Sequence, residues 1–126
     1  MLSHVNSMSN YVAVFVWPMP KRNVPAYRSM VRKFGPIVRK LGAIEYKEYV
    51  AADLKKKHGM VTFPRKIKPR PSEVLLYAVM GFRSKSHCKQ VMKRFEKYPW
   101  KDMDKMMKLV DHKRMIYGEF SLLVKA

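Results

Sequence analysis

Three stretches of the sequence carry apolar side chains at both odd and even positions, and this limits how the chain can fold. They are residues 10–17 (NYVAVFVW), 73–82 (EVLLYAVMGF) and 114–124 (RMIYGEFSLLV). β-Branched and aromatic residues in short runs favour strands. Successive side chains of a strand point to opposite faces of a sheet, so these three predicted strands need cover on both faces.

A helix is predicted between the first two strands, over residues 23–42. Its apolar residues recur every three to four positions, which gives one apolar stripe and one basic face. Asn23 is a suitable N-cap and Gly42 a suitable C-terminal stop. Pro36 cannot donate a backbone hydrogen bond, so we expect a kink there.

The remaining elements are a strand, a second helix and a short helical turn. Residues 43–52 predict a strand directly after the first helix, and residues 85–98 predict a helix with Ser84 as its N-cap. Residues 102–109 have room for one or two helical turns.

The predicted order is therefore β-α-β-β-α-β, which is the ferredoxin-like α+β arrangement: an antiparallel four-stranded sheet with two helices on one face. Residues 10–126 are expected to form this single domain, after a flexible tail at 1–9. Two helices cover only one face of the sheet. Because the strands are apolar on both faces, we expect a second copy of the chain to cover the other, which predicts a homodimer.

The charge balance bears on partners rather than on fold. Lys and Arg number 27 against nine Asp and Glu, a net charge of +18, so nucleic acid, anionic membranes and acidic ligands are all candidate partners. Highly basic surfaces also occur without such a role. The connection 53–72 is basic and long enough to be functional or mobile. Its candidate polyanion contacts are Lys55, Lys56, Lys57, Arg65, Lys66 and Arg70.

The sequence favours a cytoplasmic protein. Its single cysteine, Cys88, cannot form an internal disulfide, which fits a reducing compartment. No apolar run is long enough to cross a bilayer, so we expect no membrane insertion. The four histidines are scattered without the spacing of a metal site, and no metal is predicted.

Candidate pocket residues are Tyr46, Glu48, His87 and Tyr117. Glu48 and Glu45 point to opposite faces of one strand, so only one of them can face the helices, near Tyr46 or Tyr117. A buried carboxyl there would have a raised pKa and could act as a base. The alternative is a salt bridge to one of the many cations. His87, in the first turn of the second helix, is either a base or ligand, or simply a capping or surface residue.

Short matching stretches along nearly the whole chain carry a resemblance to a known family. They are Tyr11-Val12, Pro18-Met19-Pro20-Lys21, Tyr27, Leu41-Gly42-Ala43-Ile44-Glu45-Tyr46, Val61-Thr62-Phe63-Pro64, Phe82-Arg83-Ser84 with His87, and Lys113-Arg114-Met115-Ile116-Tyr117-Gly118 with Phe120. In these stretches the chain resembles the YbaA-like family of uncharacterised bacterial proteins. The resemblance implies a dimeric α+β barrel. Its wider superfamily includes monooxygenases, haem-degrading enzymes and isomerases, but the YbaA-like branch carries no activity or cofactor to transfer.

Two functions remain open. The first is a small-molecule enzyme or binding protein, with an apolar pocket between sheet and helices that the 53–72 segment gates. The second is a nucleic-acid-binding protein that uses phosphate contacts, because the RNA-recognition motif shares the same element order. Residues 77–82 (YAVMGF) do not match the aromatic pattern that such motifs carry on this strand.

Overall fold

The computed structural model describes residues 9–126 and contains one antiparallel sheet of four strands in the order β2-β3-β1-β4. The strands are β1 (Tyr11–Pro20), β2 (Glu45–Val50), β3 (Glu73–Phe82) and β4 (Ile116–Ser121). This order and these directions confirm the predicted ferredoxin-like α+β fold. Of the predicted tail, residues 1–8 lie outside the described residues, and Ser9 donates a hydrogen bond to Glu45.

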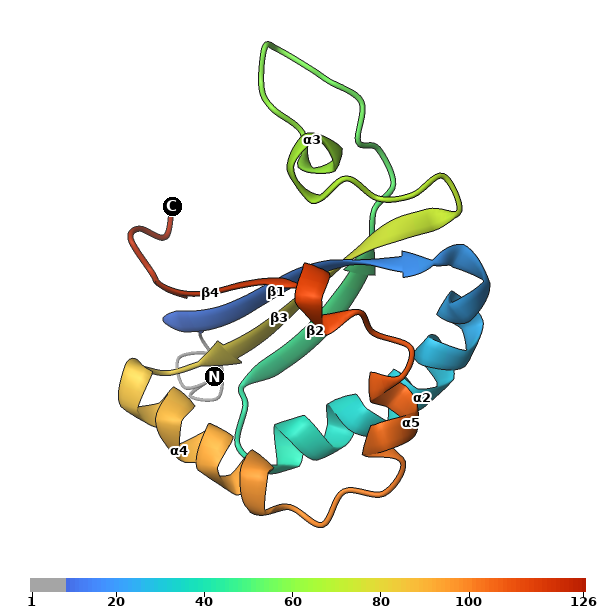
Figure 1. The fold of residues 1–126 in the computed structure, drawn as a ribbon. Helices are drawn as coiled ribbons and strands as arrows, with labels where there is room; N and C mark the ends of the chain where they lie inside the picture. The colour runs from blue at the N-terminus through green and yellow to red at the C-terminus, as the bar shows by residue number, and fades with distance from the viewer. Residues whose placement is uncertain (1–8) are drawn as a thin grey trace.

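Three α-helices lie on one side of the sheet (Figure 1): α2 (Val24–Lys40), α4 (Lys85–Lys97) and α5 (Met103–Met107). The other helical elements are η1 (Lys21–Asn23), α3 (Phe63–Ile67) and η2 (His112–Arg114). α3 belongs to the 53–72 segment, which projects on the opposite side of the sheet. We call residues 53–72 the arm.

Helix α2 runs through Pro36 to Lys40 without interruption. Asn23 occupies the N-cap position, but its side chain makes no capping hydrogen bond, so this part of the prediction is wrong. Asn23 has helical backbone angles because the preceding 3-10 turn leads directly into α2. By contrast, the Ser84 hydroxyl accepts a hydrogen bond from the His87 backbone N–H at 3.1 Å and caps α4 as predicted.

The core lies between the sheet and the helices. Cross-strand pairs such as Phe15 with Ala78, and Trp17 with Leu76, point toward the helical layer. Trp17, Met19 and Phe82 are fully buried there. The apolar stripes of α2 and α4 pack on this face, because burying apolar surface is the main favourable contribution to folding.

The opposite face of the sheet is apolar, and among the described residues the five-residue α3 of the arm is the one helix on its side. We call this face the open face. Tyr49, Tyr77, Ile116 and Phe120 point to this side and are exposed. Strand β4, predicted to be buried on both faces, is mostly exposed because it is an edge strand with β1 as its one neighbour in the sheet. The strand sequences predict that both faces of the sheet are buried, but in the described chain this second face is exposed.

An ion pair fixes the base of the arm. The Glu73 carboxylate accepts two hydrogen bonds from Arg114, at 2.8 and 2.9 Å, and one from the Arg70 backbone N–H at 2.7 Å. Arg114 also donates to the Lys68 carbonyl. These bonds join the end of the arm to the turn before β4, and they hold the pKa of Glu73 down to about 2.

Candidate functional site

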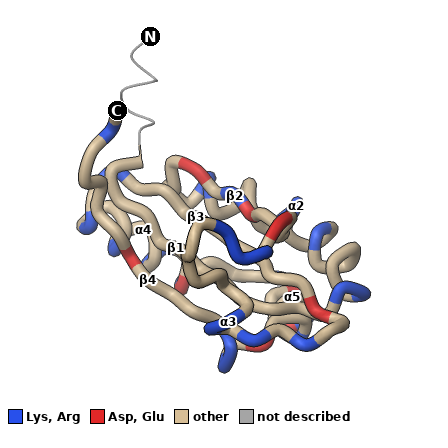
Figure 2. Tube along the Cα trace, turned by 90° about the horizontal axis from the view of Figure 1, so that it is seen from above, with Lys and Arg blue, Asp and Glu red and all other residues tan. Residues whose placement is uncertain are grey.

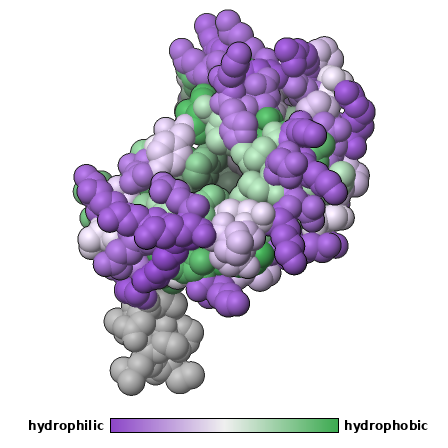
Figure 3. Space-filling view, turned by 60° about the horizontal axis from the view of Figure 1, so that its bottom comes forward, coloured by the Kyte–Doolittle hydropathy of each residue, from purple (hydrophilic) through white to green (hydrophobic). Residues whose placement is uncertain are grey.

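A cavity of about 530 Å³ lies between the sheet and the helical layer. Figure 3 shows the hollow on the helical side of the molecule, with apolar residues around it and hydrophilic residues outside them. Its walls are almost entirely apolar and include both tryptophans of the chain, Trp17 and Trp100. The other aromatic lining residues are Phe15, Tyr27, Phe34, Tyr46 and Phe95, and six methionines complete the wall.

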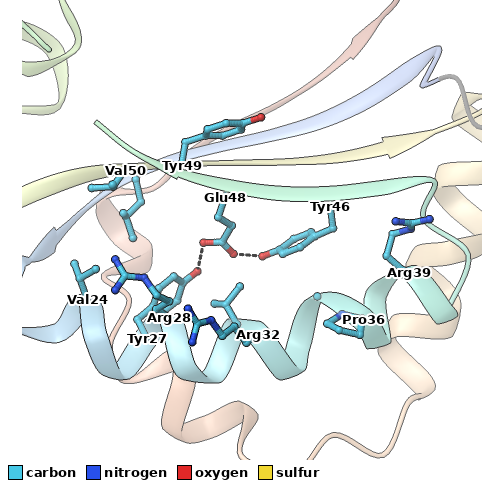
Figure 4. A pocket seen from close by; sticks show the side chains of 13 residues that line it. Val24, Tyr27, Arg28, Arg32, Pro36, Arg39, Tyr46, Glu48, Tyr49 and Val50 are labelled. Atoms are coloured by element: carbon cyan, nitrogen blue, oxygen red, sulfur yellow. Dashed lines mark hydrogen bonds between the residues drawn. The ribbon is translucent and has the colours of Figure 1, made fainter. Parts of the chain in front are cut away.

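A glutamate held by two tyrosines lies in this wall, which also includes Glu96 and His112. Oε1 of Glu48 accepts a hydrogen bond from the Tyr27 hydroxyl at 2.7 Å, and Oε2 accepts one from the Tyr46 hydroxyl (Figure 4). Both carboxylate oxygens therefore have a donor, and the position of the carboxyl is fixed. We call Tyr27, Glu48 and Tyr46 the Glu48 cluster.

Local sequence explains how the cluster forms. Tyr46 and Glu48 are two residues apart on β2, so they share the face that points toward α2. Tyr27 lies in the first turn of α2 and is buried. Gly35 of α2 faces the Tyr46 ring so closely that an added Cβ would come within 3.2 Å of it. A glycine at this position lets the Tyr46 ring lie against the helix.

Burial raises the pKa of Glu48, and the two tyrosine hydrogen bonds oppose that rise. Burial, followed by the nearby Glu48 carboxylate, also raises the pKa of both Tyr27 and Tyr46. The tyrosines therefore stay protonated and act as donors. The cluster holds a carboxyl that is a stronger base than an exposed one, with its proton-accepting oxygens fixed in position.

A second hollow, of about 650 Å³, runs between α2 and the edge strand β2. We call it the arginine groove, because Arg28, Arg32 and Arg39 line it. All three come from α2, as Figure 4 shows. The Glu48 cluster lines the groove as well as the cavity, so it forms the boundary between a basic hollow and an apolar one.

One further polar atom of the cavity wall has no partner. Nε1 of Trp17 is buried and makes no hydrogen bond within residues 9–126. Trp17 packs against Tyr27, with ring centroids 6.0 Å apart. A buried N–H without an acceptor costs free energy.

His87, predicted near the pocket, is buried at the other end of the helical layer. Its Nδ1 accepts a hydrogen bond from the Arg83 backbone N–H at 3.0 Å, and its ring packs on Phe82. Burial lowers the pKa of His87, and Arg83 and Arg94 lower it further. His87 lines neither the cavity nor the arginine groove.

Tyr117 lies on β4, at the opposite edge of the sheet from Glu48. It packs against Phe15 and donates a hydrogen bond to Glu119. Glu119 also accepts one from Tyr11 at 2.6 Å, and this bond contributes most to the rise of the Tyr11 pKa to about 12. The structure therefore brings Tyr46 and Glu48 together, but not with His87 or Tyr117.

The predicted polyanion contacts lie on the arm. Lys55, Lys56, Lys57, Arg65, Lys66 and Arg70 are all exposed. Lys57 pairs with Asp53, and Arg70 with Glu73. Figure 2 shows that Lys and Arg are spread over the helices as well as the arm. None of the arm residues lines the cavity or the arginine groove. The arm therefore does not lie where it could open or close either hollow, contrary to the prediction from the sequence.

Residues 9–126 contain no cluster of three or more His, Cys, Asp or Glu that could hold a metal ion. None of the helices formed by these residues is long and apolar enough to cross a membrane.

Comparison with known proteins gives a family but no activity. A family model described as "Protein of unknown function (DUF1428)" matches residues 10–112. The uncharacterised protein YbaA of Escherichia coli K12 is 30% identical over 116 residues, which cover 90% of this chain and 97% of YbaA. YbaA of Shigella flexneri matches to the same extent.

Two crystal structures of dimeric ferredoxin-like proteins from an uncultured marine organism share the fold. One has a TM-score of 0.61 at 8% identity and covers 96% of this chain and 94% of its own. The other has a TM-score of 0.59 at 6% identity, with coverage of 92% and 98%. At such low identity the likeness concerns the fold.

Proposed function

The chain belongs to the DUF1428 family of proteins of unknown function, and from that premise we propose that it binds a small organic molecule at the Glu48 cluster. The observation that carries the proposal is a buried carboxyl whose two oxygens are fixed by Tyr27 and Tyr46 in the wall of an apolar cavity. Concave apolar cavities with a few fixed polar groups are the usual form of ligand sites.

The chemistry of the cluster suits a ligand with a mobile proton. Burial raises the pKa of Glu48, so the carboxylate accepts a hydrogen bond or a proton more readily than an exposed glutamate. Tyr27 and Tyr46 stabilise its negative charge before that step. The reaction class that this arrangement supports is proton abstraction from a ligand held against β2, with Glu48 as the base.

A fragment screen followed by nuclear magnetic resonance tests the site. We expect fragments that bind to shift the signals of Tyr27 and Tyr46, and Glu48→Gln to weaken the binding of proton-donating fragments about tenfold. Glu45→Gln is the matched control, because Glu45 lies on the same strand and points to the open face. Fragments that bind only outside the cavity and the groove, or equal loss in both variants, would disprove the proposal.

We also propose that the chain forms a homodimer through the open face. Tyr49, Tyr77, Ile116 and Phe120 are exposed there side by side on one sheet. Exposed apolar patches of this kind mark interaction surfaces. The two ferredoxin-like relatives in structure are described as dimeric, which supports a second copy as the occupant.

Polyanion binding by the arm is the alternative function. Lys55, Lys56, Arg65 and Lys66 are exposed, and within the described residues their side chains make no hydrogen bond or ion pair. Such contacts read phosphates without sequence preference, and they weaken steeply with salt. Titration with a fluorescent single-stranded oligonucleotide at two salt concentrations tests this alternative, with neutralisation of these four residues expected to abolish binding.

A further inference from the structure

The arginine groove holds positive charge that the protein itself does not neutralise. Within residues 9–126, the side chains of Arg28 and Arg32 make no hydrogen bond or ion pair, whereas Arg39 donates to the Ala43 carbonyl at 3.2 Å. Arg28 and Arg32 are four residues apart on α2, so their side chains are neighbours on one side of the helix. Both line the groove.

This pair differs from the other basic residues of the surface by what lies next to it. The groove shares the Glu48 cluster with the apolar cavity. A molecule in the groove therefore meets two guanidinium groups beside an apolar wall that includes Val24, Val31 and Leu76. Guanidinium groups bind carboxylates and phosphates through paired hydrogen bonds.

We propose that the ligand of this site is an amphipathic anion, with a carboxylate or phosphate held by Arg28 and Arg32 and an apolar body against the apolar side chains of the groove wall. This inference rests on the proposed function and names its ligand class. Glu48 also lines the groove, but the guanidinium groups outnumber its single carboxyl there, so the groove favours an anion.

Tryptophan fluorescence gives a direct test, since Trp17 packs against Tyr27 of the groove wall, with ring centroids 6.0 Å apart. The probes are decanoate, decyl phosphate and decanol, which share one alkyl chain and differ in the head group. We expect at least one anionic probe to bind about tenfold more tightly than decanol. The double variant Arg28→Gln/Arg32→Gln should remove this preference and leave the affinity for decanol unchanged.

The control for net charge is the double variant Arg22→Gln/Lys40→Gln. It removes the same two charges from exposed positions that line neither the groove nor the cavity, and it should keep the preference for anions. An equal loss in both double variants would show general attraction to a basic protein and overturn the inference.

The failure of the inference is separable from that of the proposed function. If decanol and both anionic probes bind equally, and all shift the signals of Tyr27 and Tyr46, the inference about the head group is wrong. The proposed binding site at the Glu48 cluster is then still supported. If no probe changes the fluorescence and no fragment shifts those signals, both are wrong.

Discussion

Glu48 is a residue whose charge opposes folding. Its pKa is raised because burial outweighs the two tyrosine hydrogen bonds. An unfolded glutamate ionises near pH 4.3, whereas folded Glu48 keeps its proton to a higher pH. Between these two values the folded chain binds more protons than the unfolded chain, so the free energy of unfolding falls as the pH rises.

Replacement by glutamine should therefore stabilise the protein at high pH. We expect Glu48→Gln to raise the free energy of unfolding at pH 8, because the variant has no charge to bury. At pH 4 the difference should be close to zero. Urea denaturation at both pH values measures it, and a variant less stable than the wild type at pH 8 would contradict the interpretation.

Glu73 behaves in the opposite sense. Arg114 lowers its pKa to about 2, so its contribution to stability is complete above the unfolded pKa of about 4.3. This contribution is lost as the pH falls from about 4.3 toward 2. Glu73→Gln should reduce the free energy of unfolding at pH 7 by about 1–3 kcal/mol, with a smaller effect at pH 3.

Urea denaturation of Glu73→Gln and Glu96→Gln checks this prediction. Glu96 is exposed on α4, and among the described residues it has no ion-pair partner. Its replacement should leave stability unchanged. Equal effects of the two variants would mean that the bonds between Glu73 and Arg114 contribute nothing.

For the side chains of the Glu48 cluster, the sequence predicted only the relation between residues of the same strand. The two-residue spacing of Tyr46 and Glu48 fixes their shared face wherever the strand lies. Tyr27, the third member of the cluster, was missed, because its distance from Glu48 depends on how α2 packs on the sheet. Its place on the apolar stripe of α2 was visible in the sequence, but its hydroxyl partner was not. Arg114 and Glu73 are 41 residues apart, and no local pattern joins them.

Helix α4 depends on its first turn. The Ser84 hydroxyl accepts a hydrogen bond from the His87 backbone N–H, and the His87 ring packs on Phe82. We expect Ser84→Ala to reduce the free energy of unfolding by about 1 kcal/mol. Ser86→Ala removes only an exposed contact between the Ser84 and Ser86 hydroxyls at 3.1 Å. It leaves the bond from the His87 N–H in place and should change stability by less than about 0.5 kcal/mol.

Thermal unfolding followed by circular dichroism compares the two serine variants. Ser84→Ala should lower the melting temperature by several degrees, as about 1 kcal/mol does in a chain of this size. A melting temperature for Ser84→Ala equal to that of Ser86→Ala would show that the cap does not support the helix.

Elements were predictable where their side-chain period was clear. β1, β3, α2 and α4 agree with the prediction to within a few residues. β2 and β4 are shorter than predicted, because they are the edge strands and lose their pairing partners toward their ends. α3, a five-residue helix within the arm, was not predicted, since Pro64 and the basic residues around it show no apolar period.

For the whole molecule, the open face is the surface through which the proposed dimer would form. The strand sequences require cover on both sides, and the described helices supply it on one. The uncovered face could be predicted from the sequence, because two helices cover only one face of a sheet and the strands are apolar on both. The arginine groove needed the packing of α2 beside β2, which no pattern of single residues contains.

The assembly is tested by light scattering in high salt, which suppresses association driven by charge. A mass of about twice 14.9 kDa is expected. Tyr77→Glu places a charge in the middle of the open face, and burying an unpaired charge in a dimer interface costs several kcal/mol, so this variant should be monomeric. Gln90→Glu makes the same change of charge on the exposed side of α4 and should remain dimeric. If the wild type is a monomer, the open face is free in solution, and its exposed tyrosines and Phe120 become the place to look for a different partner.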